Sequence, residues 1–345
     1  MNQVIVIFDK REDDNDKQWL ENELSKITDY KVSFIHPDLD IPSLWIEKRK
    51  LKAYKEIVKV IKKANKIVKE YSANSIVVCW SIMTGMLSKF LINKKAIIIS
   101  LNWLTPDKRF LNTFVRKKCI RDKRFYLFAD QIGTMNEIIQ QYGIKDRNKI
   151  GYFPDTFSDE GETINITSKI VEERRKNKIC FTGGLNNRNW GLLYLVAKSL
   201  PNIHFIAVGC PKDFNKENLN NLESYNRLDS TKYYSLMKKA YLIYLPLCDE
   251  RAAGAINMYR ASKNHQVCLV THAPSTEPYF PLRFNNNLIR SSDLSINISL
   301  IKNKFDLKND EYIEEVTQIR EYLETTFSPR KIAGILIQKI KELMP

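Results

Sequence analysis

Short apolar runs alternate along this chain with stretches in which apolar residues return every three or four positions. The runs are typical of strands buried on both faces of a parallel sheet, and the spaced pattern indicates helices with one apolar side. The expected strands are residues 4–8, 31–35, 75–79, 96–99, 124–129, 150–153, 179–182, 204–208, 242–245 and 267–270. The expected helices are residues 48–71, 85–92, 107–118, 135–142, 190–199, 233–240, a segment with Ile256, Tyr259 and Arg260, and a C-terminal segment that begins at Ser328-Pro329.

This alternation predicts an α/β fold with doubly wound parallel sheets. The alternation stops in a polar stretch at about 157–177 and then restarts, which predicts a linker between two similar domains with a cleft between them. We therefore expect a first domain at residues 1–157, a second at 158–327, and a C-terminal helix at 328–345 that crosses back toward the first. Ser328 and Pro329 are suited to the N-cap and first turn of that helix.

The composition excludes several classes of protein. The 345 residues are 43% hydrophobic and 28% charged, which is ordinary for a globular protein. No stretch approaches the ~20 apolar residues of a membrane-spanning helix, and the first apolar run is too short for a signal peptide. The six cysteines and four histidines are dispersed without metal-ligand spacing, so we expect reduced thiols, a cytoplasmic protein and no metal site.

The net charge of +15 has two explanations. Lysine, asparagine and isoleucine are all frequent, as an AT-rich coding sequence would produce, and the lysines are then simply solvated. Alternatively, the charge forms a basic face for an anionic partner. Lysines and arginines crowd residues 48–69 and 116–124, both in the first half of the chain. Such a face suits an anionic membrane surface, and nucleic acid is the weaker alternative.

Candidate binding residues follow the expected strands of the second half. Ligands of open α/β sheets lie at the carboxyl ends of strands, against helix N-termini. Gly183 and Gly184 follow one strand and either let a phosphate approach the backbone or form an ordinary tight turn. Arg188 offers a planar fork for a diphosphate, with a solvated position in the first turn of a helix as the alternative. The loop from Glu250 to Gly254 follows another strand.

Three segments of the second half resemble a known family. They are FTGGLNNRNWGLLYLVAKSLPNIHFIAVG (181–209), YYSLMKKAYLIYLPL (233–247) and AGAINMYRASKNHQVCLVT (253–271). These segments are similar to the C-terminal domain of group 1 glycosyltransferases of GT-B architecture, which transfer sugars from nucleotide diphosphates. The first half is similar only in its alternation of strands and helices. The resemblance implies two Rossmann-like domains that face a cleft, with the nucleotide sugar on the second domain and the acceptor on the first.

The resemblance also implies roles for individual residues. Gly254 and Ala255 would let a phosphate approach the next helix, and Asn257 would have a lesser part in the same donor site. Glu250 would accept the hydroxyl groups of the sugar, with a surface pair to Arg251 as the alternative. No metal is expected to assist the donor diphosphate.

Other implied roles concern the base and the reacting groups. The backbone of Arg227 and Leu228 lies where relatives hold the nucleotide base. Asp9 ends the first strand of the chain, and Asp9 or, as the alternative, Glu12 would be the catalytic base of an inverting enzyme. Trp80 and Trp103 follow later strands of the first half, where they either stack on a sugar ring or pack in the core.

The sequence departs from the family pattern at three places. Arg260 stands where relatives carry a glutamate that binds ribose hydroxyls, and a guanidinium offers only donors. Residues 265–267 replace a Gly-Lys-Pro sequence, and the loop at 9–12 lacks the usual glycine. Arg260 either binds donor phosphate, binds an acidic sugar, or pairs with Glu250.

These observations predict a cytoplasmic glycosyltransferase at the inner face of the plasma membrane. Its partners would be a nucleotide sugar and a glycan or lipid-linked acceptor in surface polysaccharide biosynthesis. The departures also leave open a non-catalytic GT-B subunit that supports an active partner. A glycosyltransferase that acts on nucleic acid is the third alternative, suggested by the basic first half.

Overall fold

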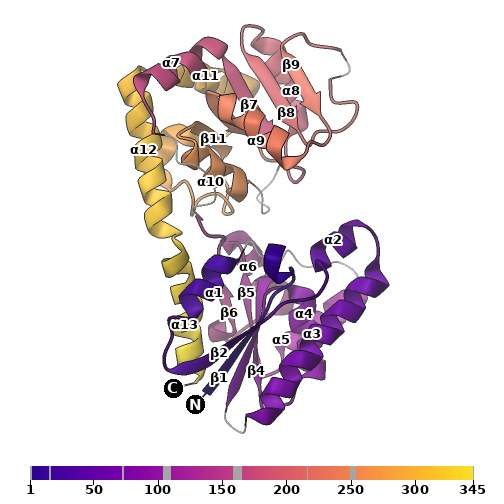
Figure 1. The fold of residues 1–345 in the computed structure, drawn as a ribbon. Helices are drawn as coiled ribbons and strands as arrows, with labels where there is room; N and C mark the ends of the chain where they lie inside the picture. The colour runs from indigo at the N-terminus through magenta and orange to yellow at the C-terminus, as the bar shows by residue number, and fades with distance from the viewer. Residues whose placement is uncertain are drawn as a thin grey trace. The chain divides into compact units, whose positions relative to one another are not determined.

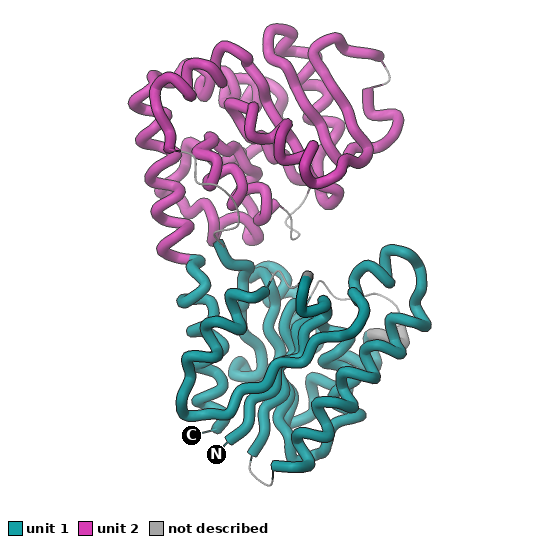
Figure 2. Tube along the Cα trace, viewed as in Figure 1, with its two compact units in different colours: residues 1–158, 327–345 teal, residues 159–326 magenta. Residues whose placement is uncertain are grey.

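The chain divides into two compact units (Figure 2). Unit 1 comprises Met1–Ser158 and Phe327–Pro345, and unit 2 comprises Asp159–Thr326. The computed structural model describes residues 2–14, 17–71, 74–103, 110–157, 165–215, 217–248 and 254–344. Within these ranges, no helix has the length and apolar character that crossing a bilayer requires.

Unit 1 contains a six-stranded parallel sheet (Figure 1). Its strand order is β2-β1-β3-β4-β5-β6, with Val4 of β1 paired to Val32 of β2 and Ile76 of β3. The inner strands β1, β3, β4 and β5 are almost fully buried because helices cover both faces, as the continuous apolar runs of the sequence require. The bounds are β1 Asn2–Ile7, β2 Tyr30–Ile35, β3 Ser75–Cys79, β4 Ile97–Trp103, β5 Phe125–Ala129 and β6 Ile150–Tyr152.

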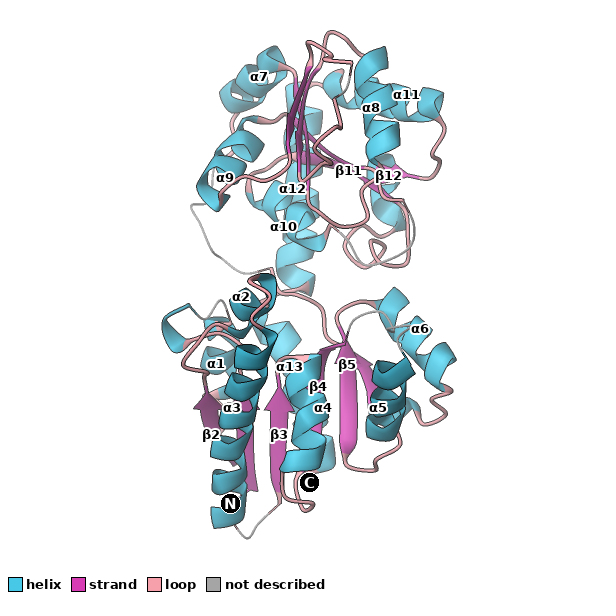
Figure 3. Ribbon diagram, turned by 90° about the vertical axis from the view of Figure 1, so that its right-hand side faces the viewer, coloured by secondary structure: helices cyan, strands magenta, loops and turns pink. Residues whose placement is uncertain are grey.

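The helices of unit 1 form two layers (Figure 3). Helices α3 (Lys50–Glu70), α4 (Ile82–Leu91), α5 (Phe110–Ile120) and α6 (Ile132–Tyr142) cover one face of the sheet, as right-handed crossovers between successive strands require. Short helix α2 (Ile41–Ile46) leads into α3. Helices α1 (Gln18–Leu24) and α13 (Pro329–Leu343) pack together on the other face. The Ser328 hydroxyl accepts a hydrogen bond from the backbone N–H of Lys331, which confirms the predicted N-cap.

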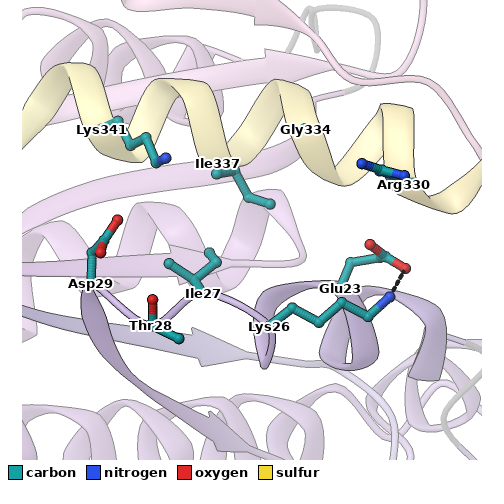
Figure 4. A pocket seen from close by; sticks show the side chains of 9 residues that line it. All are labelled: Glu23, Lys26, Ile27, Thr28, Asp29, Arg330, Gly334, Ile337 and Lys341. Atoms are coloured by element: carbon teal, nitrogen blue, oxygen red, sulfur yellow. Dashed lines mark hydrogen bonds and ion pairs between the residues drawn. The ribbon is translucent and has the colours of Figure 1, made fainter.

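A groove of about 560 Å³ runs between α13 and the turn that joins α1 to β2 (Figure 4). Side chains of both charge signs line it, and Lys26 pairs with Glu23 at 2.6 Å. The remaining lining residues are Ile27, Thr28, Asp29, Arg330, Gly334, Ile337 and Lys341. This balance of charge gives the groove no clear preference for an ionic ligand.

Unit 2 contains a second six-stranded parallel sheet, of order β12-β11-β10-β7-β8-β9. Its central strands are buried on both faces, again between two layers of helices. The strands are β7 Ile179–Gly183, β8 His204–Val208, β9 Leu222–Tyr225, β10 Leu242–Leu245, β11 Val267–Thr271 and β12 Leu288–Ile289. The helices are α7 Ser168–Asn177, α8 Trp190–Ser199, α9 Ser230–Lys239, α10 Ala255–Lys263, α11 Leu294–Phe305 and α12 Asn309–Thr326.

The polar stretch that we expected to be a linker is partly helical. Helix α7 (Ser168–Asn177) occupies its second half, and the Thr167 hydroxyl caps it by accepting from the N–H of Ile170. The prediction was wrong there because α7 buries only Val171 and Arg174, so its sequence carries almost no apolar periodicity. Residues 158–164 of the same stretch lie outside the described part of the chain.

The described cysteines are all free thiols, as expected. Five of them are buried, but Cys248 is exposed at the end of the segment that follows β10. Its backbone N–H donates to the Asn187 carbonyl, so this exposed thiol lies beside the loop that follows β7.

Candidate functional site

Two glycine turns meet at the carboxyl ends of β7 and β8. Gly184 and Gly209 have φ angles of +114° and +94°, a region that side-chain-bearing residues rarely adopt. The Gly184 N–H donates to the Val208 carbonyl at 3.0 Å. A Cβ added at Gly209 would lie 2.7 Å from the Gly184 oxygen, so the two backbones touch. Gly183 is similarly enclosed, since a Cβ there would lie 2.0 Å from the Tyr233 hydroxyl.

Arg188 is held inside this site by backbone contacts. Its Nε donates to the Gly183 carbonyl at 2.9 Å, and its Nη1 donates to the Asn186 carbonyl at 3.0 Å. The Arg188 backbone also pairs with Leu247, which fastens the loop to the segment after β10. The residue is only 5% exposed, so the alternative of a solvated arginine is wrong.

The third nitrogen of Arg188 faces two glycines. Its Nη2 lies 2.7 Å from the position that a Cβ would take at Gly184 and 3.8 Å from the same position at Gly254. No described residue forms an ion pair with this guanidinium, and burial lowers its pKa below the usual value. An arginine that is buried without a carboxylate is costly, and an anion at this place would relieve the cost.

The N-terminus of α10 lies beside this guanidinium. Gly254 is its N-cap residue with a φ of +93°, and Ala255 is the first helical residue. The first N–H groups of a helix lack partners within the helix, and they favour an anion together with the helix dipole. Since neither Gly254 nor Ala255 carries a bulky side chain, an anion can approach this terminus closely.

A chain of hydrogen bonds joins α9, α10 and β7. The Tyr233 hydroxyl donates to Asn257 Oδ1 at 2.7 Å, and Asn257 Nδ2 donates to the Gly183 carbonyl at 2.7 Å. That carbonyl therefore accepts from both Asn257 and Arg188. The sequence pointed to Asn257 as a lesser candidate, and its position indicates that it orients the glycine turn.

Arg260 lies against aromatic rings. Its guanidinium carbon is 4.2 Å from the centre of the Tyr234 ring and 5.8 Å from that of Tyr233, which are cation–π distances. Burial raises the pKa of Tyr233, and the charges of Arg260 and Arg188 oppose that rise. No ion pair joins Arg260 to a described residue. Its predicted pairing with Glu250 stays untested because Glu250 lies outside the described residues.

The other predicted residues are spread over both units. Arg227 is exposed and Leu228 is half-buried in the turn between β9 and α9. Asp9 is half-buried in unit 1, two residues beyond β1, and its carbonyl accepts from the N–H of Ile41. Among the described residues, no three histidines, cysteines or acids gather as metal ligands.

The tryptophans of unit 1 belong to the core. Trp103 is fully buried, and its indole N–H donates to the Ser100 hydroxyl at 2.8 Å. Trp80 is buried against the rings of Phe8, Trp19 and Phe153. Core packing, rather than stacking on a sugar, therefore accounts for both.

Sequence reasoning gave no role to Tyr233, Tyr234 or Gly209. Gly209 could have been found, because a glycine directly after a buried strand is the same signal that drew attention to Gly183. The tyrosines carry no such signal. Tyr233 reaches Asn257 across 24 positions of the chain, and only the packing of α9 beside α10 brings them together.

Solved structures share this fold over nearly the whole chain. A glycosyltransferase from Rickettsia africae ESF-5 matches with a TM-score of 0.65 at 14% identity, over 99% of this chain and 98% of that one. The N-terminal domain of trehalose-6-phosphate phosphatase from Candida albicans matches with a TM-score of 0.64 at 10% identity, over 99% and 96%. Anabaena HepE, solved with UDP and glucose, matches with a TM-score of 0.64 at 12% identity, over 99% of each chain.

These similarities show the fold. The prediction of an α/β chain with two Rossmann-like, doubly wound domains of GT-B type is confirmed. No protein-family model matches the sequence, and neither does any curated protein. The departures at Arg260 and at residues 265–267 therefore do not change the overall fold.

His265 shows how one departure is accommodated. It follows α10 with a φ of +47°, a conformation for which glycine is favoured. Its Nε2 lies 2.7 Å from Arg320 Nη1, and its carbonyl accepts from Arg174 Nη1 at 2.9 Å. Burial, together with the charges of Arg320 and Arg174, lowers the pKa of His265 to about 4. The ring is therefore neutral in the folded protein and accepts a hydrogen bond from Arg320.

We expect His265 to make stability depend on pH. Its pKa is about 4 in the folded state against an ordinary 6.5, so the unfolded chain binds more protons between these values. Stability should therefore fall by about 2 kcal/mol as the pH drops from roughly 6.5 to 4. Denaturant unfolding of His265→Asn, which tolerates the positive φ, should lack this loss. Parallel losses in the wild type and the variant would contradict the assignment.

Proposed function

We propose that this protein is a glycosyltransferase that moves a sugar from a nucleotide-diphosphate donor to a glycan or lipid-linked acceptor. The observation that carries the proposal is the Arg188 guanidinium. It is 5% exposed, faces Gly184 and Gly254, and pairs with no described carboxylate. A diphosphate matches it, because an arginine fork and the N–H groups of a helix terminus both favour phosphate oxygens.

The similar structures support this proposal in two ways. The matching protein of Rickettsia africae ESF-5 is a glycosyltransferase, and the matching HepE structure contains UDP and glucose. Structures of TarM, one of them with UDP and alpha-GlcNAc-glycerol, match 77% of this chain. Surface polysaccharide synthesis is the setting that we propose on these grounds.

Each candidate residue has a distinct part in the proposed reaction. Gly183 holds Arg188 through its carbonyl, and Gly184 has no side chain to cover the guanidinium. Gly254 and Ala255 present helix N–H groups, and the guanidinium of Arg188 neutralises charge on the leaving diphosphate. Since Arg188 supplies this charge, no metal is required.

The remaining candidates concern the two ends of the donor. The backbone at Arg227 and Leu228 would receive the base, and Glu250 would accept sugar hydroxyls. If the reaction inverts the anomeric carbon, Asp9 is the residue that we propose to remove the proton of the acceptor hydroxyl.

Arg260 favours a second candidate function, a non-catalytic subunit. It stands where the family's glutamate receives ribose hydroxyls, and it stacks on Tyr234 at 4.2 Å instead. A chain that lost donor binding could keep the fold and support an active partner. Such a subunit would have no reason to retain a buried Arg188 that forms no ion pair with a described residue, which is why we prefer the enzyme.

A thermal-shift screen distinguishes the two candidates. The melting temperature of the protein would be measured with UDP-, GDP-, dTDP- and CMP-sugars. We expect one diphosphate sugar to raise it, because a ligand that binds only the native state stabilises that state. CMP-sugars, which have a single phosphate, should act more weakly. The subunit hypothesis predicts no shift with any of them.

A further inference from the structure

One face of unit 1 exposes large apolar side chains beside a dense set of lysines. Ile46 and Leu51 are 70% and 71% exposed at the corner between α2 and α3, and Phe114 of α5 is 56% exposed. All large, exposed hydrophobic residues among the described part of unit 1 lie on α2, α3, α4 or α5: Ile46, Leu51, Tyr54, Phe90, Leu91 and Phe114. The described parts of α1 and α13, on the opposite face, carry none.

The lysines of α3 form a continuous stripe. Their spacing of three and four residues places them on one side of the helix, and all are exposed: Lys52, Lys55, Lys59, Lys62, Lys66 and Lys69. The opposite side of α3 packs on the sheet through Ile57, Ile61 and Val68. Of the two glutamates in α3, Glu56 is buried and, among the described residues, pairs only with Lys59, at 3.8 Å, so little negative charge offsets the rest of the stripe.

Few of these charges form ion pairs with described residues. Asp38 pairs with Lys59 and, at 3.3 Å, with Lys63. Lys52, Lys55 and Lys62 form no ion pair with a described residue. Farther along the same layer, α5 and the turn after it expose Lys117, Lys118 and Arg121. Helices α3, α4 and α5 lie side by side in one layer of unit 1 (Figure 3), and these exposed residues all belong to that layer.

We propose that this face, made of α2, α3, α4 and α5, docks on an anionic lipid bilayer. Exposed apolar residues that insert at the headgroup level, surrounded by lysines, are the chemistry of an interfacial membrane site. A coding bias toward lysine does not explain why all the large, exposed apolar residues in the described part of unit 1 lie on these helices. Duplex DNA would use the lysines but not Ile46 and Leu51, so the pair favours lipid. This proposal does not depend on the donor site.

Vesicle binding tests the proposal. The full-length protein would be sedimented with vesicles of phosphatidylcholine alone or mixed with phosphatidylglycerol. We expect binding to the mixed vesicles, and Lys52→Gln/Lys55→Gln/Lys62→Gln should weaken it on the order of 100-fold. Replacing Ile46 and Leu51 with serine should weaken it about tenfold or more, without changing the melting temperature, because both side chains are already exposed.

A matched control removes the same charge from the opposite face. Arg330, Lys331 and Lys341 are exposed on α13, and their replacement with glutamine should leave vesicle binding within about twofold of the wild type. Equal losses in the two triple variants would show a non-specific effect of net charge and overturn the proposal. Wild-type protein that binds duplex DNA but not the mixed vesicles would overturn it in favour of nucleic acid.

Discussion

The Arg188→Met variant should lose donor binding while keeping its fold. Methionine fills a similar volume but cannot meet a phosphate, so we expect affinity for the preferred nucleotide sugar to fall on the order of 100-fold or more. Stability without ligand should change little, because the loss of two hydrogen bonds is offset by removal of a buried charge that has no described ion-pair partner. Calorimetric titration measures the affinity, and thermal unfolding of the free protein measures the stability.

Arg188→Lys provides the matched control. Lysine retains the charge but loses the fixed contacts of Nε and Nη1 with the Gly183 and Asn186 carbonyls. We expect an affinity between that of the wild type and that of Arg188→Met. If both variants bind the donor like the wild type, Arg188 is a structural residue and the proposed site is wrong.

Gly209→Ala should cost both stability and donor binding. The added Cβ would lie 2.7 Å from the Gly184 oxygen and 2.9 Å from its carbonyl carbon, at a φ of +94°. Because both atoms belong to backbone, one of the two turns must move. We expect a loss of about 3 kcal/mol in the free energy of unfolding. Displacing the Gly184 turn should also weaken donor binding, which distinguishes this variant from one that only destabilises unit 2.

Gly191→Ala serves as its control. Gly191 lies in α8, and a Cβ there would meet only Asn189 Oδ1 at 3.8 Å. Alanine favours a helix over glycine, so the free energy of unfolding should stay equal or rise by up to about 1 kcal/mol. If the two glycine variants lose similar amounts of unfolding free energy, the contact between the Gly184 and Gly209 turns does not explain the need for glycine at position 209.

The sheets were the most predictable part of the fold. Three of the strands have the predicted bounds: Ser75–Cys79, His204–Val208 and Leu242–Leu245. A strand that is buried on both faces appears as a continuous apolar run, so it can be identified from its own residues alone. Strand β9 was missed because it is an edge strand in which only Leu222 is buried. Helix α12 was missed although Tyr312, Val316, Ile319 and Leu323 follow helical spacing.

The candidate site was less predictable than the fold. The glycines after β7 and the presence of Arg188 can be read from the sequence. The burial of Arg188 cannot, because its loop pairs with Leu247 and Cys248, about sixty positions away. Likewise, Asn257 reaches the Gly183 carbonyl across 74 positions. Such contacts depend on how the helices pack on the sheet, which local patterns do not determine.

The departures from the family pattern gain a physical meaning only from the structure. His265 occupies a glycine-like conformation and is kept neutral by burial and by neighbouring arginines, so it replaces glycine without disrupting the end of α10. The Arg260 guanidinium stacks on the Tyr234 ring, and this contact holds the charged group in place. Neither substitution blocks the turns at Gly183 and Gly184.

The central claim is that unit 2 binds a nucleoside diphosphate through the Arg188 guanidinium and the N-terminus of α10. The most direct test is calorimetric titration of the wild-type protein with UDP, GDP and dTDP, in which the affinity for each diphosphate is compared with the affinity for its free nucleoside. We predict that one diphosphate binds at least about 100-fold more tightly than its nucleoside, since the phosphates make the charged contacts. Equal affinity for the diphosphate and the nucleoside, or no binding of any diphosphate, would contradict the account.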